Sequence, residues 1–183
     1  EFSGLRISLD LVSLPSDGGP QTIISTADGA RNPHFGADHD RVFMNDDTGL
    51  FSIQLDGTDR RDELVVTAPR GNRRGEEPPK SESEKISPDG RYALAHVGKQ
   101  LWVIAVTKTG AKAPTVDVRG SALPAAQITD IGADFYGWTD DGESVWWAIG
   151  NTFHTRAFES IAFREDKDEE SSDDNGDDEE EPF

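Results

Sequence analysis

The four histidines are the side chains best suited to metal or acid–base chemistry, and their spacing matches no zinc motif. His34, His39, His96 and His154 form neither a His-x-His pair nor a His-Glu-x-x-His segment. The chain also lacks cysteine and a Gly-x-Ser-x-Gly elbow for a nucleophilic serine. The sequence therefore predicts no catalytic residue, no metal ligand and no cofactor in this chain. Only His34 is a binding candidate, because it precedes a predicted strand.

An arginine-rich insertion at 68–80 is the second candidate for binding. It contains Arg70, Arg73 and Arg74, followed by two glutamates. A guanidinium can hold a carboxylate through two parallel hydrogen bonds. The three arginines are therefore predicted to contact an acidic group of a ligand, and the alternative is a solvated loop that binds nothing.

Three aspartates recur at matching positions. Asp38, Asp89 and Asp141 each come three residues after a large apolar residue, and a glycine follows the last two. Aspartate side chains at such positions accept hydrogen bonds from the backbone two residues on. We interpret them as turn-forming residues, and the alternative is a set of ligands.

These residues belong to an internal repeat. Segments 35–55, 86–106 and 138–158 align without a gap, at offsets of 51 and 52 residues. Two insertions, 68–80 and 110–124, lengthen the connections between the copies, and the second one is predicted to be a spacer. Without the insertions each repeat has 41 residues, and a period of about 40–45 residues is typical of β-propeller blades.

Each repeat contains short alternating apolar runs separated by Gly and Asp turns, which predict antiparallel strands. First strands are expected to start at Phe35, Ile86 and Trp138. Second strands are expected at 41–45, 91–97 and 144–149, and third strands at 50–55 and 101–106. Fourth strands are expected at 63–67 and at either 115–118 or 126–129. A strand pair at 5–14 and 21–25 precedes them. No sustained helical period is present, so almost no helix is expected.

The predicted fold is therefore all-β: four-stranded antiparallel blades that form a partial propeller of about three blades. This domain spans 1–158, with blade segments 5–25, 32–67, 84–129 and 135–158. A propeller closes with about 4–8 blades, so the chain is expected to be a fragment or to associate. Five aromatic residues are predicted to lie in or near the blade faces, and loss of Trp146 is expected to destabilise the last blade strongly: Phe43, Trp102, Trp138, Trp146 and Trp147.

Charge separates the end of the chain from the rest. The formal net charge is −18, and segment 159–183 contributes 13 acidic residues against Arg164 and Lys167. We predict an acidic, disordered, low-complexity tail there. Such a charge repels phosphate backbones, so nucleic acid is not an expected partner. No apolar run is long enough for a membrane span, and no signal peptide is evident.

The motif Ser87-Pro88-Asp89-Gly90-Arg91, followed by Leu101-Trp102-Val103, resembles the PD40 (WD40-like) repeat of TolB-type propellers. Segments 35–41 and 138–144 look like degenerate copies. A narrower resemblance covers 128–153, which is similar to the propeller region before the catalytic barrel of amidohydrolase-family proteins. The metal-binding histidines of that family lie in the barrel, and this chain has no such motif.

The resemblance implies a non-catalytic propeller segment that serves as scaffold or protein- and substrate-binding platform. Its partners would be the remaining blades or the catalytic domain of a longer parent, a second copy, or a protein or peptide ligand. The parent would be a metal-dependent amidohydrolase that holds a divalent metal. The alternatives are a TolB-like periplasmic adaptor without enzyme activity and the propeller gate of a tricorn-like serine peptidase. A periplasmic or secreted location is implied by the resemblance only.

Overall fold

The computed structural model describes residues 9–27, 29–69, 77–107, 112–120 and 122–163. This part of the chain contains fourteen β-strands and a single short 3₁₀ turn, Phe158–Ser160. The predictions of an all-β chain with almost no helix are confirmed. None of its helical segments is long and apolar enough to cross a membrane.

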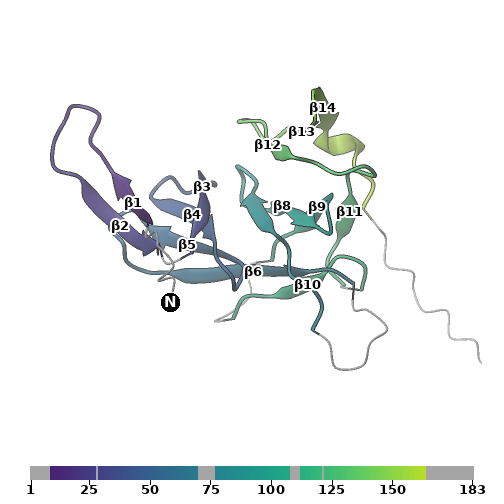
Figure 1. Cartoon of the computed structure of the whole chain (residues 1–183), viewed down its shortest axis with the longest axis horizontal. Helices are drawn as coiled ribbons and strands as arrows, with labels where there is room; N and C mark the ends of the chain where they lie inside the picture. Colours follow the sequence, from purple (N-terminus) through teal and green to yellow (C-terminus); the bar gives the residue numbers. More distant parts are fainter. Residues whose placement is uncertain (1–8, 28, 70–76, 108–111, 121, 164–183) are drawn as a thin grey trace, which may run out of the picture.

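The strands form four separate sheets. A hairpin pairs β1 (Leu9–Ser13) with β2 (Thr22–Ala27). The first sheet has the order β10-β6-β5-β4-β3, the second β11-β9-β8-β7 and the third β12-β13-β14. Figure 1 shows the hairpin at one end of the molecule and the third sheet at the other, with the first two sheets between them.

The strand bounds follow the predicted runs closely. The first sheet is built from β3 (Arg31–Phe35), β4 (Arg41–Asn45), β5 (Leu50–Gln54) and β6 (Arg61–Thr67). The second contains β7 (Ser83–Ile86), β8 (Tyr92–Val97), β9 (Gln100–Ala105) and β11 (Ala125–Gln127). The third contains β12 (Phe135–Trp138), β13 (Ser144–Ile149) and β14 (Thr152–Ala157).

One expectation about strand bounds was wrong. The first strand of each repeat was expected to start at Phe35, Ile86 or Trp138, whereas β3, β7 and β12 end at these residues. The tight turn therefore follows immediately. Gly90 and Gly142 have φ angles of 73° and 72°, which glycine adopts at no steric cost.

The recurring aspartates stabilise these turns. Asp38 Oδ1 accepts a hydrogen bond from the Asp40 amide at 2.9 Å. Asp89 accepts one from the Arg91 amide at 3.0 Å, and Asp141 one from the Glu143 amide at 2.9 Å. The turn-forming interpretation is confirmed.

The insertion at 110–124 does more than separate strands, so its interpretation as a spacer was wrong. β10 (Thr115–Asp117) lies beside β6 in parallel, which makes it a fifth strand of the first sheet. Val116 and Val118 are buried there. The fourth strand of the second sheet is β11, so the 126–129 alternative was the better one. The connection thereby ties the second sheet to the outer edge of the first.

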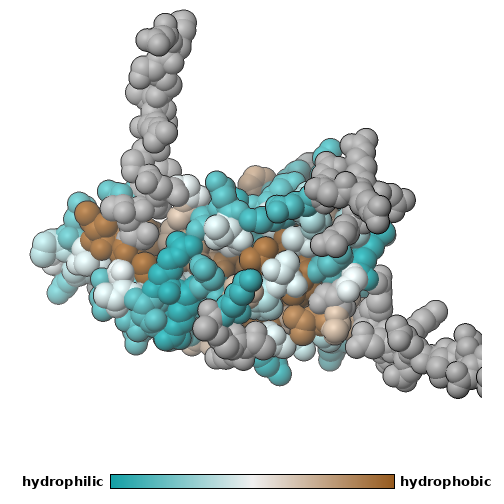
Figure 2. Space-filling view, turned by 90° about the horizontal axis from the view of Figure 1, so that it is seen from below, coloured by the Kyte–Doolittle hydropathy of each residue, from teal (hydrophilic) through white to brown (hydrophobic). Residues whose placement is uncertain are grey.

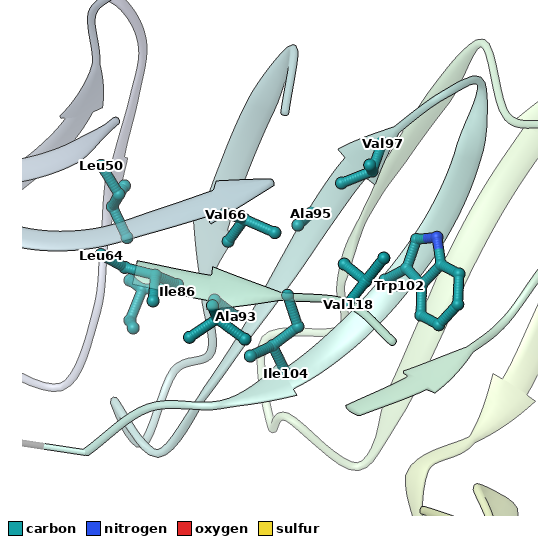
Figure 3. Packing of buried hydrophobic residues seen from close by; sticks show 11 residues of the cluster. Leu50, Leu64, Val66, Ile86, Ala93, Ala95, Val97, Trp102, Ile104 and Val118 are labelled. Carbon is teal, nitrogen blue, oxygen red and sulfur yellow. The ribbon is translucent and has the colours of Figure 1, made fainter. Parts of the chain in front are cut away.

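Successive sheets pack face to face through three apolar clusters. The hairpin contributes Leu11 and Ile24 against Val42, Met44 and Phe51 of the first sheet. The first and second sheets bury an eleven-residue cluster, shown in Figure 3, in which Leu50 and Leu64 meet Ile86 and Ile104. The second and third sheets bury Leu94, Leu101, Val103, Tyr136 and Val145.

Residues at the same aligned position of the repeat, which we call a column, lie on the same face of each sheet. Phe43 and Leu50 of the first sheet face the second, and their counterparts Leu94 and Leu101 face the third. The next counterparts, Trp146 and Phe153, lie on the outward face of the third sheet because side chains alternate along a strand.

The prediction for the tryptophans therefore needs one correction. Trp102 is buried, and Trp138 and Trp147 pack against the cluster between the second and third sheets. Phe43 packs against the cluster between the first two sheets. Trp146 points the other way, because it directly precedes Trp147 in β13, and it contacts no neighbouring sheet.

Packing also continues past 158, since Ile161 is buried and Phe163 stacks on Tyr92. The predicted disorder from 164 onwards lies outside the described residues.

Candidate functional site

His34, the histidine singled out from the sequence, lies inside β3 rather than before it. Its Nδ1 is 2.7 Å from the carbonyl oxygen of Asn32, and its Nε2 accepts a hydrogen bond from the Ile86 amide at 2.9 Å. Burial lowers the pKa of His34, although the Asn32 carbonyl opposes this. A neutral ring, with its proton on Nδ1, satisfies both contacts. His34 therefore joins the first sheet to the second.

A buried carboxyl lies next to this contact. Glu84 of β7 is 2% exposed and Asn45 of β4 is fully buried. The Asn45 amide donates to Glu84 Oε2 at 2.7 Å, and the Ser81 hydroxyl donates to Oε1. Loss of water around the carboxyl raises the pKa of Glu84 to about 7.

A cavity of about 180 Å³ opens above this pair. Charged side chains of both signs line it: Arg31, Asp46, Asp47, Lys80 and Glu84. Hydrogen bonds to the side chain and amide of Thr48 and to Arg60 lower the pKa of Asp46 to about 2 despite partial burial, so it is ionised at neutral pH. We call this cavity, with its five charged side chains, the charged pocket. It offers donors and acceptors suited to a polar group such as a peptide backbone or terminus.

The arginine-rich insertion starts and ends at the charged pocket. Thr67 and Lys80 form a single antiparallel bridge, and the Ala68 amide donates to the Pro79 carbonyl at 2.8 Å. Lys80 Nζ also donates to the Asp47 carbonyl at 2.9 Å. The two ends of the insertion are thereby held next to Glu84. Arg70, Arg73 and Arg74 themselves lie outside the described residues.

A second polar cluster occupies the same end of the interface between the second and third sheets. Lys85 Nζ donates to the Tyr136 carbonyl at 2.8 Å, and the Ser83 and Tyr136 hydroxyls form a hydrogen bond. His96 Nδ1 is 2.9 Å from Glu82 Oε2, and its ring stacks on Tyr136 at 5.8 Å. These contacts connect strand β7 with strand β12, as His34 connects β3 with β7.

The outward face of the third sheet exposes two large apolar side chains. Phe135 is 71% exposed and Phe153 is 64% exposed. Eight uncharged residues make up this face, which we call the open face: Phe135, Gly137, Ser144, Trp146, Ala148, Phe153, Thr155 and Ala157. Figure 2 shows another side of the molecule, where apolar residues appear in several patches among hydrophilic ones.

Sequence reasoning missed the charged pocket and the open face. Glu84 and Asn45 stand in no recognisable motif, and only the packing of two sheets brings them together. The open face had a usable signal, because the counterparts of Phe153 and Thr155 are buried in both earlier repeats.

No group of three or more His, Asp and Glu side chains that could hold a metal ion occurs among the described residues. Comparison of the chain with protein-family models, with curated proteins and with solved structures finds no match in any of the three.

Proposed function

We propose that the sheets are blades of a β-propeller and that the chain is a non-catalytic segment of it, a scaffold and protein- or peptide-binding platform within a larger protein. The observation that carries this proposal is the recurrence of one packing arrangement. Each sheet uses the same columns to face the next sheet, at two successive interfaces. Radial stacking of repeated sheets, each in contact only with its neighbours, is how propellers are built.

The contacts between innermost strands support a radial arrangement. The indole of Trp138 donates to the Lys85 carbonyl at 3.1 Å, and Arg31 donates to the Glu82 carbonyl at 3.2 Å. With the His34 and Lys85 contacts, these bonds hold β3, β7 and β12 close together. In a propeller the first strands of the blades meet in this way around a central channel.

The open face supports a continuation of the stack. Phe153 occupies the column of Leu50 and Leu101, which are both buried against the next sheet. A further sheet with the aliphatic pattern of Val42, Met44 and Ile53 would cover it. By the amidohydrolase resemblance, the larger protein is a hydrolase whose divalent metal lies in a different domain.

The charged pocket and the insertion that begins and ends beside it would supply the binding platform. The pocket lies at the end of the sheets where β6 leads into the insertion. Arg70, Arg73 and Arg74 would add cationic contacts for an acidic peptide.

A selection of displayed random peptides against the full chain tests the binding function. We expect enriched acidic peptides whose affinity falls about tenfold in the R70A/R73A/R74A variant, with a smaller loss in the corresponding triple lysine variant, which keeps the charge. Failure to enrich any peptide, or equal affinity of the alanine variant, would contradict the proposal. Turnover of amide or peptide substrates by the chain would contradict its non-catalytic part.

A further inference from the structure

A pocket of about 460 Å³ lies between the second and third sheets, at the opposite end of the strands from the charged pocket. The turns after β7 and β12 form its rim, whereas the turn between β4 and β5 lines the charged pocket. Successive turns of an antiparallel sheet lie at opposite ends. We call this second cavity the aromatic pocket, since Tyr92, Trp138 and Phe158 line it.

The three rings form a cluster. The Tyr92 and Phe158 centroids are 4.6 Å apart, and those of Trp138 and Phe158 are 5.7 Å apart. All three side chains are partly exposed. Aromatic faces attract cations through the negative potential above the ring, and the guanidinium of Arg91 already lies 5.9 Å from the centre of the Tyr92 ring.

Four carboxylates surround the rings against a single cation, Arg91. Asp89 is paired with Arg91 at 2.6 Å, and Asp141 accepts hydrogen bonds in its own turn. The side chains of Glu143 and Glu159 are exposed and have no hydrogen-bond or ion-pair partner in the described part of the chain. The lining of the pocket therefore carries three negative charges in excess, and two of them, on Glu143 and Glu159, have no partner among the described residues.

The equivalent groove between the first and second sheets indicates that a guanidinium would suit the aromatic pocket. Arg41, in the column of Tyr92, lines that groove with a guanidinium only 7% exposed. It donates to Asp59 at 2.8 Å and to the Ser52 hydroxyl at 2.9 Å. There a carboxylate and a hydroxyl hold the chain's own guanidinium, whereas the same column between the second and third sheets carries the aromatic ring of Tyr92.

We infer that the aromatic pocket binds the guanidinium of an arginine side chain presented by a protein or peptide partner. The cation would lie against Tyr92, Trp138 and Phe158, and the free carboxylates of Glu143 and Glu159 would neutralise it. This inference does not rest on the proposed function, because its residues and its end of the molecule differ from those of the charged pocket.

The test is an NMR titration of the full chain with Nα-acetyl-arginine amide, in which the indole N–H signals report on the pocket. We expect a saturable shift of the Trp138 signal, and none with the neutral isostere Nα-acetyl-citrulline amide. Two exposed carboxylate contacts predict that E143Q/E159Q binds about tenfold more weakly. E77Q, which removes one charge at the opposite end, should bind as the parent chain does.

Three results would overturn the inference. They are an equal response to the citrulline compound, unchanged affinity in E143Q/E159Q, and an equal loss in E77Q, which would show attraction by net charge alone. Loss of peptide selection in the triple arginine variant would leave this titration unaffected, so the two proposals fail separately.

Discussion

The two faces of the third sheet differ in burial although the same repeat supplies both. Val145 on the inner face is fully buried against the second sheet, whereas Phe153 on the open face is 64% exposed. In the second sheet, the counterpart of Phe153 is Leu101, which is fully buried. Residue type does not explain this difference, because the more exposed residue is the larger apolar one. Position in the stack explains it: one face packs against the second sheet, and the apolar clusters of the described residues include no side chain of the other face.

Under the proposed function, the open face would be the surface on which the next sheet packs. The comparison therefore connects the fold with the proposed scaffold function. Mutations at matched columns of the covered and the uncovered face test it.

The largest difference is expected for one matched pair. Leu101→Ala removes a buried side chain from the cluster between the second and third sheets, and such changes cost about 2–5 kcal/mol of unfolding free energy. Phe153→Ala, in the same column, should cost less than about 1 kcal/mol because water already reaches the ring. Urea denaturation measures both, and equal losses would show that the open face is not bare.

Neighbouring tryptophans in β13 provide a second pair. Trp147 packs against the second sheet and stacks on His154 at 5.1 Å. Trp146 stacks only on Phe153, and its indole donates to the Trp138 carbonyl at 3.0 Å. Trp147→Ala should therefore destabilise the chain by about 3 kcal/mol and Trp146→Ala by roughly half as much. This replaces the strong effect that the sequence alone predicted for Trp146, and the reverse order in urea melts would contradict the structure.

The ionisation of Glu84 reports on whether the interface between the first and second sheets is closed. Desolvation raises the pKa of this carboxyl to about 7, above its value in the unfolded chain. Its favourable contribution is therefore complete below about pH 4.5 and is lost as pH rises through 7, by on the order of 2 kcal/mol. Glu84→Gln cannot ionise, so its unfolding free energy should vary less over this range and exceed that of the parent at pH 8. Parallel pH profiles of the two proteins would refute burial of Glu84.

A smaller effect is expected on the open face itself. A Cβ atom at Gly137 would lie 2.7 Å from Cζ2 of Trp146, so Gly137→Ala must displace the indole. We expect a loss of about 1 kcal/mol and a changed Trp146 indole signal by NMR. Gly120→Ala, at an ordinary φ and with only van der Waals contacts around the added Cβ, controls for the general cost of alanine at a glycine. An unaltered Trp146 signal would argue against the stated packing.

The sequence predicted the strands well where a run alternates within a repeat. RVFMN and SVWWAI match β4 and β13 residue for residue, because alternation and flanking turns are local properties. It offered 115–118 as a fourth strand but could not assign β10 to the first sheet, because these residues pair only with a distant strand.

The candidate site was harder to predict than the strands. His34 was selected for its position, and its role in linking two sheets follows from contacts with Asn32 and Ile86 that only the folded chain makes. Glu84 resembles any other glutamate of an acidic chain until two sheets close over it. For Trp146 and Trp147, alternation alone could have indicated that they face opposite sides.

The central claim, that the sheets are stacked radially as blades, is tested most directly by two spin-label distances between the first and third sheets. The chain contains no cysteine, so introduced cysteines can be labelled selectively. The pair Arg31→Cys/Asp134→Cys labels the start of β3 and the matching position just before β12, and the pair Gln54→Cys/Ala157→Cys labels the ends of β5 and β14, the matching third strands. Electron–electron double resonance should give a clearly longer distance for the third-strand pair than for the innermost pair, because blades diverge away from their axis. Equal distances, or a longer innermost distance, would mean that the sheets lie in parallel layers and would contradict the account.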